Sequence, residues 1–250
     1  DSNNNFMGGS EILQLVPHKG KLYASVSYWQ DESNIWYGGS NSNIGWSQII
    51  SLENPESSWV VDLDMGPYHL RPEVLKEVIF TKDSSGDLLP NPDTLLVAGA
   101  FSSNYFFGPV SANAFIKYDD NWIKTLIFEG SQPGQSESYS MRDMELFTDS
   151  VTGQEHLIVS VGTKGIFSGQ YNPNAEGRIS WDPVPEIGSL STRPLGIAVA
   201  NGVLYFSSGN KIYRRFDGEN PTYSVVHDFS DLSSNINSAV GGIRGITKIN

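Results

Sequence analysis

The chain contains no cysteine among its 250 residues. Disulfide bonds and thiolate chemistry are therefore excluded. Long apolar runs are missing too, because no stretch approaches the roughly 18 residues that a membrane-spanning helix needs. The first ten residues, DSNNNFMGGS, are polar and do not form a signal peptide, although a mature exported protein without its leader would look the same. We expect no membrane insertion.

Positive charge is scarce in this sequence. Lys plus Arg number 16 against 28 for Asp plus Glu, which gives a formal net charge of -12 at pH 7. A field of this sign repels the phosphates of nucleic acids, so we expect no nucleic-acid partner. Charged residues make up only 18% of the chain, while Ser, Asn and Gly are plentiful. This balance is typical of exported β-proteins and predicts a secreted or periplasmic location.

Motifs for common cofactors and nucleophiles are also absent. The glycine pairs at 8–9, 38–39 and 241–242 precede no helical pattern, so they form neither a phosphate loop nor a dinucleotide fingerprint. The four histidines have no metal-ligand spacing, and the loop from Asp83 to Asp87 lacks the glutamate that completes a calcium loop of the EF-hand type. We expect no cofactor and no metal ion.

Helical periodicity is nearly missing from the chain. The best candidate, PEVLKEVIF at 72–80, is rich in β-branched residues, so we predict a strand there. The chain is therefore expected to be all-β.

A β-meander is clearest in the stretch from Arg193 to Arg215. Short apolar runs are separated by Asn201-Gly202 and Gly209-Asn210, residue types that tolerate the positive φ of tight hairpin turns. The spacing predicts three consecutive antiparallel strands.

Similar units recur along the chain, with openings near residues 10, 71, 142, 193 and 244. Both Arg142 to Arg193 and Arg193 to Arg244 span 51 residues, and the longer second unit contains a polar insert at 84–93 that we predict to be a surface loop. Self-similarity at this period is the signature of propeller blades. A four-stranded blade cannot bury its two apolar faces alone, so blades pack around an axis.

We therefore predict a single domain over 1–250, a β-propeller of four-stranded antiparallel blades, with about five blades or part of a larger ring. The chain ends inside its fifth unit, which leaves a fragment of a longer protein as one interpretation. A β-sandwich of meandering strands is the alternative fold.

One unit resembles the repeat of kelch-like propellers. The resemblance covers residues 95–128, and the matching positions are Gly99, Phe101, Ala114, Tyr118, Trp122 and Leu126. It implies the propeller fold and carries no catalytic residue with it.

Arginines stand at the head of successive units. If the first strand of each unit lines the axis, these guanidinium groups meet at one end of the central channel, where they suit a carboxylate, sulfate or phosphate. Alternatively, each arginine pairs with a carboxylate of a neighbouring blade, such as Glu73, Asp143 or Glu145, and fastens the blades together. The candidate ligand-binding arginines are Arg71, Arg142, Arg193 and Arg244.

Two further groups of residues are candidates for carbohydrate chemistry. Tyr68 and His69 precede Arg71 closely enough for a proton transfer in β-elimination on a uronic-acid polymer. Trp29, Trp36 and Tyr37 lie in or beside a Gly/Asn-rich loop, where aromatic faces either stack on a sugar or fold onto the next blade.

The primary functional interpretation is a non-catalytic, lectin-like propeller that binds a carbohydrate or another anionic ligand at the blade-loop face. The alternative is a polysaccharide-degrading enzyme of lyase type that uses Arg, His and Tyr at the channel mouth. A protein-interaction scaffold, with a protein partner or further propeller blades, is the second alternative. The sequence leaves open whether the chain is an enzyme.

Overall fold

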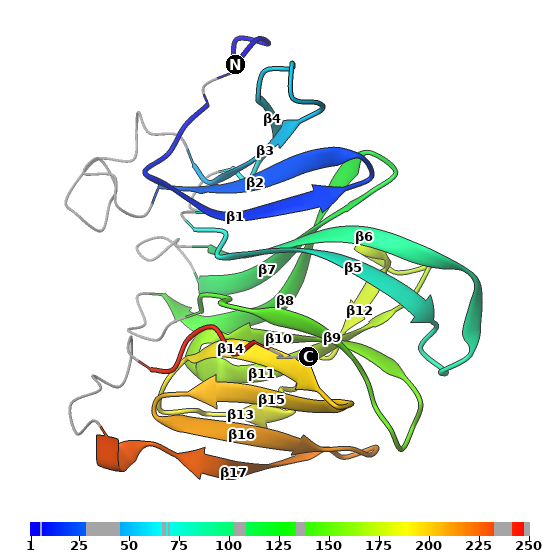
Figure 1. Cartoon of the computed structure of the whole chain (residues 1–250), viewed down its shortest axis with the longest axis vertical. Coiled ribbons are helices and arrows are strands. Elements are labelled where there is room, and N and C mark those ends of the chain that lie inside the picture. The colour runs from blue at the N-terminus through cyan, green and yellow to red at the C-terminus, as the bar shows by residue number, and fades with distance from the viewer. Residues whose placement is uncertain are drawn as a thin grey trace.

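Four antiparallel sheets follow one another along the chain (Figure 1). The computed structural model describes residues 1–5, 7–28, 46–66, 69, 71–102, 109–133, 139–232 and 242–247. Within each sheet the strands pair in chain order, apart from a short additional strand in the third. The predicted all-β propeller with four-stranded antiparallel blades is confirmed.

Blades 1 and 2 are regular four-stranded meanders. Blade 1 contains β1 (Glu11–His18), β2 (Lys21–Ser27), β3 (Gln48–Leu52) and β4 (Val60–Asp64). Blade 2 contains β5 (Val74–Lys82), β6 (Leu88–Ser102), β7 (Pro109–Tyr118) and β8 (Asn121–Pro133). The strand predicted at 72–80 is thus present as β5.

Blade 3 has an extra short strand, and blade 4 is again regular. Blade 3 contains β9 (Met144–Thr148), β10 (Glu155–Val161), β11 (Gly165–Tyr171), β12 (Ile179–Trp181) and β13 (Ile187–Gly188), which pairs with β11. Blade 4 contains β14 (Pro194–Ala200), β15 (Val203–Ser208), β16 (Lys211–Phe216) and β17 (Thr222–Asp228).

The helices of the described chain are single 3₁₀ turns. They are η2 (Gly162–Lys164), η3 (Glu176–Arg178) and η4 (Ser230–Leu232). Among the described residues, none of the helices has the length and apolar character that a membrane crossing requires.

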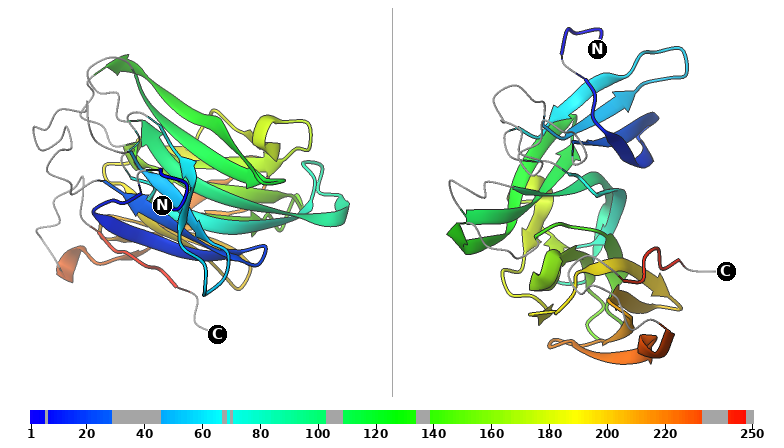
Figure 2. Two further views of the ribbon diagram at one scale, coloured as in Figure 1. Left: turned by 90° about the horizontal axis from the view of Figure 1, so that it is seen from above. Right: turned by 90° about the vertical axis from the view of Figure 1, so that its left-hand side faces the viewer.

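The first strand of each blade is the innermost one. β5 contacts β1 on one side and β9 on the other, and β9 contacts β14. Figures 1 and 2 show the four sheets stacked in this order, with the inner strands side by side. The inner strands therefore begin at one common end of the molecule and finish at the other.

Apolar residues fill the spaces between the blades. Phe80, Leu95 and Val97 of blade 2 pack against Leu157 and Phe167 of blade 3 in the largest cluster. Smaller clusters join blade 1 to blade 2 and blade 3 to blade 4. Burial on both faces explains why a strand such as β10 carries apolar residues in successive positions as well as alternate ones.

Hairpin turns form where the sequence predicts them. Asn201 and Gly202 have φ angles of 51° and 73°, and Lys19 and Gly20 have φ angles of 45° and 82°. Two consecutive residues with positive φ match the right-handed twist of the flanking strands.

The surface loop predicted at 84–93 is wrong for most of its length. β6 already begins at Leu88 and includes Pro90 and Pro92. The pairing jumps from Lys82↔Leu88 to Phe80↔Asp93, so both prolines fall in the irregular part of the hairpin. Prolines are tolerated there because their missing N–H groups remove no ladder hydrogen bond.

The fifth unit is present only as an irregular segment. Residues 242–247 contain no regular strand, although the Ile243 N–H donates to the carbonyl oxygen of Gly209 at 3.0 Å. The hydroxyl of Ser207 donates to the Ile243 carbonyl at 2.8 Å. The segment therefore lies against blade 4. The kelch-like resemblance stays a prediction, because a four-stranded antiparallel blade is common to propellers in general.

A glycine next to β13 provides a test of the packing in blade 3. Gly165 has a φ of 118°, and a Cβ atom there would lie 1.8 Å from the carbonyl oxygen of Ile187. We expect Gly165→Ala to lower the free energy of unfolding by more than the roughly 1–3 kcal/mol of backbone strain alone. Urea denaturation measures this loss. Gly202→Ala is the matched control, since Gly202 also has positive φ but has open space around it, and an equal loss in both variants would contradict the packing argument.

Candidate functional site

The arginines at the unit heads meet around one buried glutamate. Arg71 lies three residues before β5, and its Nε is 2.8 Å from Oε1 of Glu73. The Nε of Arg142, two residues before β9, forms an ion pair with Oε2 of the same carboxylate. Arg193, at the start of blade 4, interacts electrostatically with Glu73, and Arg244, in the segment after blade 4, interacts with Arg142 and Arg193. We call Arg71, Glu73, Arg142, Arg193 and Arg244 the arginine–glutamate cluster.

Burial makes the charges of this cluster costly. The side chains of Glu73 and Arg142 are only 5% and 13% exposed. Burial raises the pKa of the Glu73 carboxyl, although its three nearest arginines act in the opposite direction. Burial also lowers the pKa of Arg142 to about 10, and the neighbouring arginines add to this effect. Both shifts favour the neutral form of the group, as removal from water does.

The arginines of the cluster have further polar neighbours. Glu11 approaches Arg71, with its Oε1 3.6 Å from the Nη2 of Arg71. Arg193 is buried and donates from Nη1 to the Ser140 hydroxyl at 3.1 Å, whereas Arg244 is exposed. Glu73 thus fastens Arg71 to Arg142 across blades 2 and 3, while ligand binding by these arginines stays a prediction.

Of the other predicted site residues, the structure describes His69 alone. His69 is buried, with its ring edge-to-face against Phe115 at 5.3 Å between centroids. Tyr68, Trp29, Trp36 and Tyr37 lie outside the described residues. Their proposed roles stay predictions.

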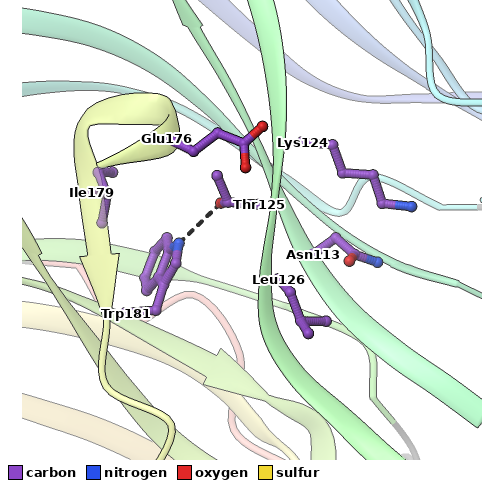
Figure 3. A pocket seen from close by; sticks show the side chains of 7 residues that line it. All are labelled: Asn113, Lys124, Thr125, Leu126, Glu176, Ile179 and Trp181. Carbon is purple, nitrogen blue, oxygen red and sulfur yellow. Dashed lines mark hydrogen bonds between the residues drawn. The ribbon is translucent and has the colours of Figure 1, made fainter. Parts of the chain in front are cut away.

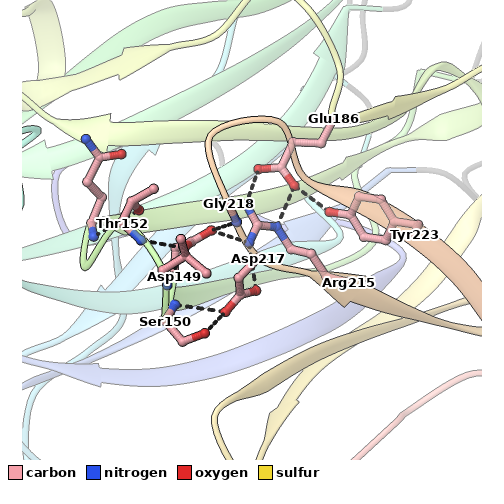
Figure 4. Close-up of polar contacts among 10 residues, drawn as sticks. Asp149, Ser150, Thr152, Glu186, Arg215, Asp217, Gly218 and Tyr223 are labelled. Carbon is pink, nitrogen blue, oxygen red and sulfur yellow. Dashed lines mark hydrogen bonds and ion pairs between the residues drawn. The ribbon is translucent and has the colours of Figure 1, made fainter.

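A second charged network, which the sequence analysis missed, lies at the opposite end of blades 3 and 4 (Figure 4). Arg215 of β16 is 1% exposed, and its Nη1 donates to Asp149 at 2.7 Å and to Asp217 at 3.0 Å. Its Nε and Nη2 donate to the two oxygens of Glu186 at 2.8 and 3.1 Å. The hydroxyl of Tyr223 also donates to Glu186.

The sequence did contain one signal for this network. Arg215 lies two residues after Tyr213 in β16, so both side chains point to the same face of the strand. Tyr213 packs in the core between blades 3 and 4. A charged side chain at a core-facing position requires buried counter-ions. The positions of those counter-ions, at the ends of β9 and β16 and before β13, depend on the fold.

A cavity of about 600 Å³ adjoins the buried guanidinium of Arg215. It lies between the turn that follows β9 in blade 3 and the turn that follows β16 in blade 4. We call it the interblade cavity. Its walls include Thr152, Gln154, His156, Ser168, Asp182, Glu186, Glu219 and Pro221.

A shallower hollow of about 450 Å³ lies beside the outer strands of blades 2 and 3 (Figure 3). The indole N–H of Trp181 donates to the Thr125 hydroxyl at 3.0 Å, and Lys124 and Glu176 also line this hollow. Lys124 and Thr125 are adjacent in β8 and therefore point to opposite faces of the strand. The hollow thus wraps around a strand edge and brings together no catalytic group.

Metal ligands do not converge in the part of the chain that the structure describes. There, no three His, Cys, Asp or Glu side chains are arranged to hold a metal ion. In the loop at 83–87, the Asp83 Oδ1 accepts hydrogen bonds from the N–H groups of Ser85 and Asp87. This carboxylate closes a turn, in keeping with the expectation that the loop is a solvated turn.

Comparisons with known proteins find resemblance in structure alone. No protein-family model and no curated protein sequence matches the chain. A Coprinopsis cinerea α-L-arabinofuranosidase catalytic domain aligns at a TM-score of 0.40 and 13% identity, covering 97% of this chain and 76% of that one. A proposed exo-β-1,3-galactanase of Bifidobacterium bifidum aligns at 0.35 and 11%, covering 86% and 68%. An exo-β-1,3-galactanase of Phanerochaete chrysosporium aligns at 0.37 and 11%, covering 91% of this chain and 51% of that one.

These findings correct the primary functional interpretation. The similar structures are described as glycan-degrading enzymes and not as lectins, so the non-catalytic, lectin-like interpretation is dropped in favour of its alternative. At TM-scores of 0.35 to 0.40 the alignments transfer no substrate and no catalytic residue to this chain.

The Arg215 network predicts a specific acid sensitivity. Burial alone would raise the pKa of Asp149, but hydrogen bonds from the Thr152 N–H, the Arg215 guanidinium and other backbone N–H groups outweigh it and hold this pKa well below its ordinary value. A carboxyl whose pKa is lower in the folded than in the unfolded chain stabilises the fold above the unfolded pKa of about 3.9 and loses this contribution as the pH falls.

We therefore expect the free energy of unfolding to decrease as the pH falls below about 4, and Asp149→Asn to flatten this decrease while lowering stability at neutral pH. Urea denaturation from about pH 7 down to about pH 2 measures both effects, because the contribution of such a carboxylate is lost between roughly pH 5 and pH 1. Asp87→Asn, at an exposed turn position, is the control and should keep the wild-type profile. An Asp149→Asn profile parallel to the wild type would contradict the assignment.

Proposed function

We propose that the protein is a polysaccharide-degrading enzyme of lyase type that acts on an anionic polysaccharide at the end of the blades where the inner strands begin. The supporting observation is the convergence of Arg71, Arg142 and Arg193 around Glu73, with Arg244 acting on Arg142 and Arg193. No neutral substrate requires such a concentration of guanidinium groups in a chain with a net charge of -12.

Electrostatics supports an anionic substrate. A carboxylate on a sugar ring offers two oxygens in the geometry that a guanidinium fork binds bidentately. Burial lowers the pKa of Arg142, and the charges of Arg193, Arg71 and Arg244 lower it further. A bound anionic group close to these guanidinium groups opposes both effects and is therefore favoured.

The same charges suit β-elimination. When the carboxylate of a uronic acid is neutralised by arginine, the proton on the ring carbon that carries it becomes easier to remove. A base takes this proton, and the electron pair forms a double bond to the neighbouring carbon as the glycosidic bond on that carbon breaks. An acid then protonates the departing oxygen. The products are one chain with a new hydroxyl group and one with an unsaturated end.

Within this scheme Glu73 has a positioning role. Its two oxygens form ion pairs with the Nε atoms of Arg71 and Arg142, which keeps both guanidinium groups beside one carboxylate. His69 and Tyr68 are our candidates for proton transfer because they lie within three residues of Arg71. The composition further supports a secreted or periplasmic location, where such polymers occur.

The proposed activity is tested with a panel of polyuronates. We expect incubation with polygalacturonate, alginate, glucuronan or hyaluronan to give ultraviolet absorbance from an unsaturated product for at least one polymer, and none with neutral galactan or arabinan. Reducing ends are assayed in parallel. Reducing ends without unsaturated product would contradict the lyase mechanism, and the absence of cleavage across both classes would contradict the enzymatic proposal as a whole.

Arg244 provides the sharpest mutational test, since its exposure separates binding from stability. We expect Arg244→Ala to weaken binding of the cleaved polyuronate by roughly tenfold, the equivalent of about one charge-assisted hydrogen bond, with an unchanged melting temperature. Arg214→Ala is the matched control, because this guanidinium lies 5.0 Å from the Phe216 ring, away from the cluster. Equal affinity in the two variants would show that Arg244 does not contact the substrate.

The Glu73→Gln variant distinguishes the role of Glu73 in joining the blades from its role in substrate binding. It is measured by the same affinity and melting-temperature experiments. Loss of this carboxylate leaves Arg71 and Arg142 without the counter-ion they share, so we expect the melting temperature to fall. A stable variant with unchanged affinity would contradict the positioning role of Glu73.

A further inference from the structure

The interblade cavity lies far from the arginine–glutamate cluster along the blades. Arg142 precedes the inner strand β9, and Asp149, which binds Arg215 beside the cavity, directly follows it. The two sites are therefore at opposite ends of the same strand. At about 600 Å³ the cavity falls within the roughly 300–1,000 Å³ that is usual for small-molecule sites.

Three polar side chains of the cavity wall have no hydrogen-bond partner among the described residues. His156 of β10 has a buried Nδ1 atom without a partner. Ser168 of β11 is 7% exposed, and its hydroxyl makes no hydrogen bond within the described chain. Glu219, in the turn before β17, likewise has neither an ion pair nor a hydrogen bond there. Of these groups, the Nδ1 of His156 is buried and unsatisfied, whereas Glu219 is exposed at the rim. Buried polar groups are normally satisfied, so this atom in the wall of a cavity of ligand size indicates a ligand that donates to it.

Most donors of the cavity wall other than the Ser168 hydroxyl are, in contrast, already engaged. Arg215 uses four of its N–H groups on the three carboxylates of its network. The side-chain amide of Gln154 donates to the Ser84 carbonyl at 2.8 Å. What the wall offers is mainly acceptors, namely the Nδ1 of His156 in the tautomer protonated at Nε2 and the carboxylates of Glu219 and Asp182. A matching ligand must supply several donors.

Charge restricts the ligand further. Asp182, Glu186 and Glu219 line the cavity, and its single guanidinium is neutralised within the Arg215 network. An anionic sugar such as a uronate is therefore repelled. Pro221 and Val151 provide apolar surface for the C–H faces of a ring.

The geometry points to a second carbohydrate site in the interblade cavity, which binds one neutral sugar residue by accepting hydrogen bonds from its hydroxyl groups onto His156 and Glu219. This site is separate from the proposed lyase site in position and opposite to it in charge preference. The enzyme then holds neutral residues at one end of blades 3 and 4 and acidic residues at the other.

The test is isothermal titration of the whole chain with the methyl glycosides of glucose, galactose, mannose, xylose and arabinose. We expect at least one of these neutral probes to bind, and His156→Leu and Glu219→Gln each to weaken it at least tenfold. His227→Leu and Glu56→Gln are the matched controls, since both residues are exposed and neither lines the cavity. Both should retain the wild-type affinity, and Arg244→Ala should retain it as well.

Methyl glucuronoside serves as the charged probe. Any binding that it shows should be weakened by Arg244→Ala and unaffected by His156→Leu. The proposal is overturned if no neutral glycoside binds, if neutral binding survives both His156→Leu and Glu219→Gln, or if the glucuronoside is the probe that those two variants weaken. Because the polyuronate assay does not involve this cavity, failure here leaves the proposed lyase activity to be judged by its own experiment.

Discussion

The carboxylate of Glu73 is the constraint on which the centre of the molecule depends. It comes from the start of blade 2 and binds one arginine of its own blade and one of blade 3. Without it, two buried guanidinium groups would face each other and a third from blade 4 across a poorly solvated space. Removal of one partner from a buried ion pair typically costs about 3–5 kcal/mol, which is a large fraction of the stability of a domain. The repeated arginines are therefore possible only because one acidic side chain stands among them.

The Arg215 network, at the other end of blades 3 and 4, has the opposite composition. There, one buried guanidinium is surrounded by three carboxylates, so the excess charge is negative. Both networks join neighbouring blades, the first through one carboxylate shared by two arginines and the second through one arginine shared by three carboxylates.

The fold was predictable from the sequence because its determinants are local. The positive φ values of Asn201 and Gly202, the apolar runs and the 51-residue spacing each depend on residues that are close together in the chain. The position of the unit-head arginines followed from the repeat in the same way.

The chemistry of the sites was less predictable because it depends on contacts across blades. Arg215 meets Asp149, which is 66 residues away, and Glu186, which is 29 residues away. The sequence named Glu73 as a candidate partner of the arginines. Its contact with two arginines at once could not be predicted, because it depends on how the inner strands of blades 2 and 3 lie side by side. The loop expected at 84–93 failed for a related reason, since proline content alone does not reveal an irregular pairing such as that of β5 with β6.

The hairpin between β5 and β6 extends over the edge of blade 3 and ties the two blades together. Glu155 of β10 accepts hydrogen bonds from the backbone N–H groups of Thr81 and Lys82 at 2.7 and 3.0 Å, and the Lys82 ammonium donates to the carbonyl oxygen of Gly153 at 2.6 Å. Blades that share backbone hydrogen bonds in this way are not interchangeable modules. A shortened or recombined version of this chain that separates blade 2 from blade 3 would expose both the Glu155 carboxylate and the N–H groups that donate to it. Blades 2 and 3 therefore have to be kept together in any such variant.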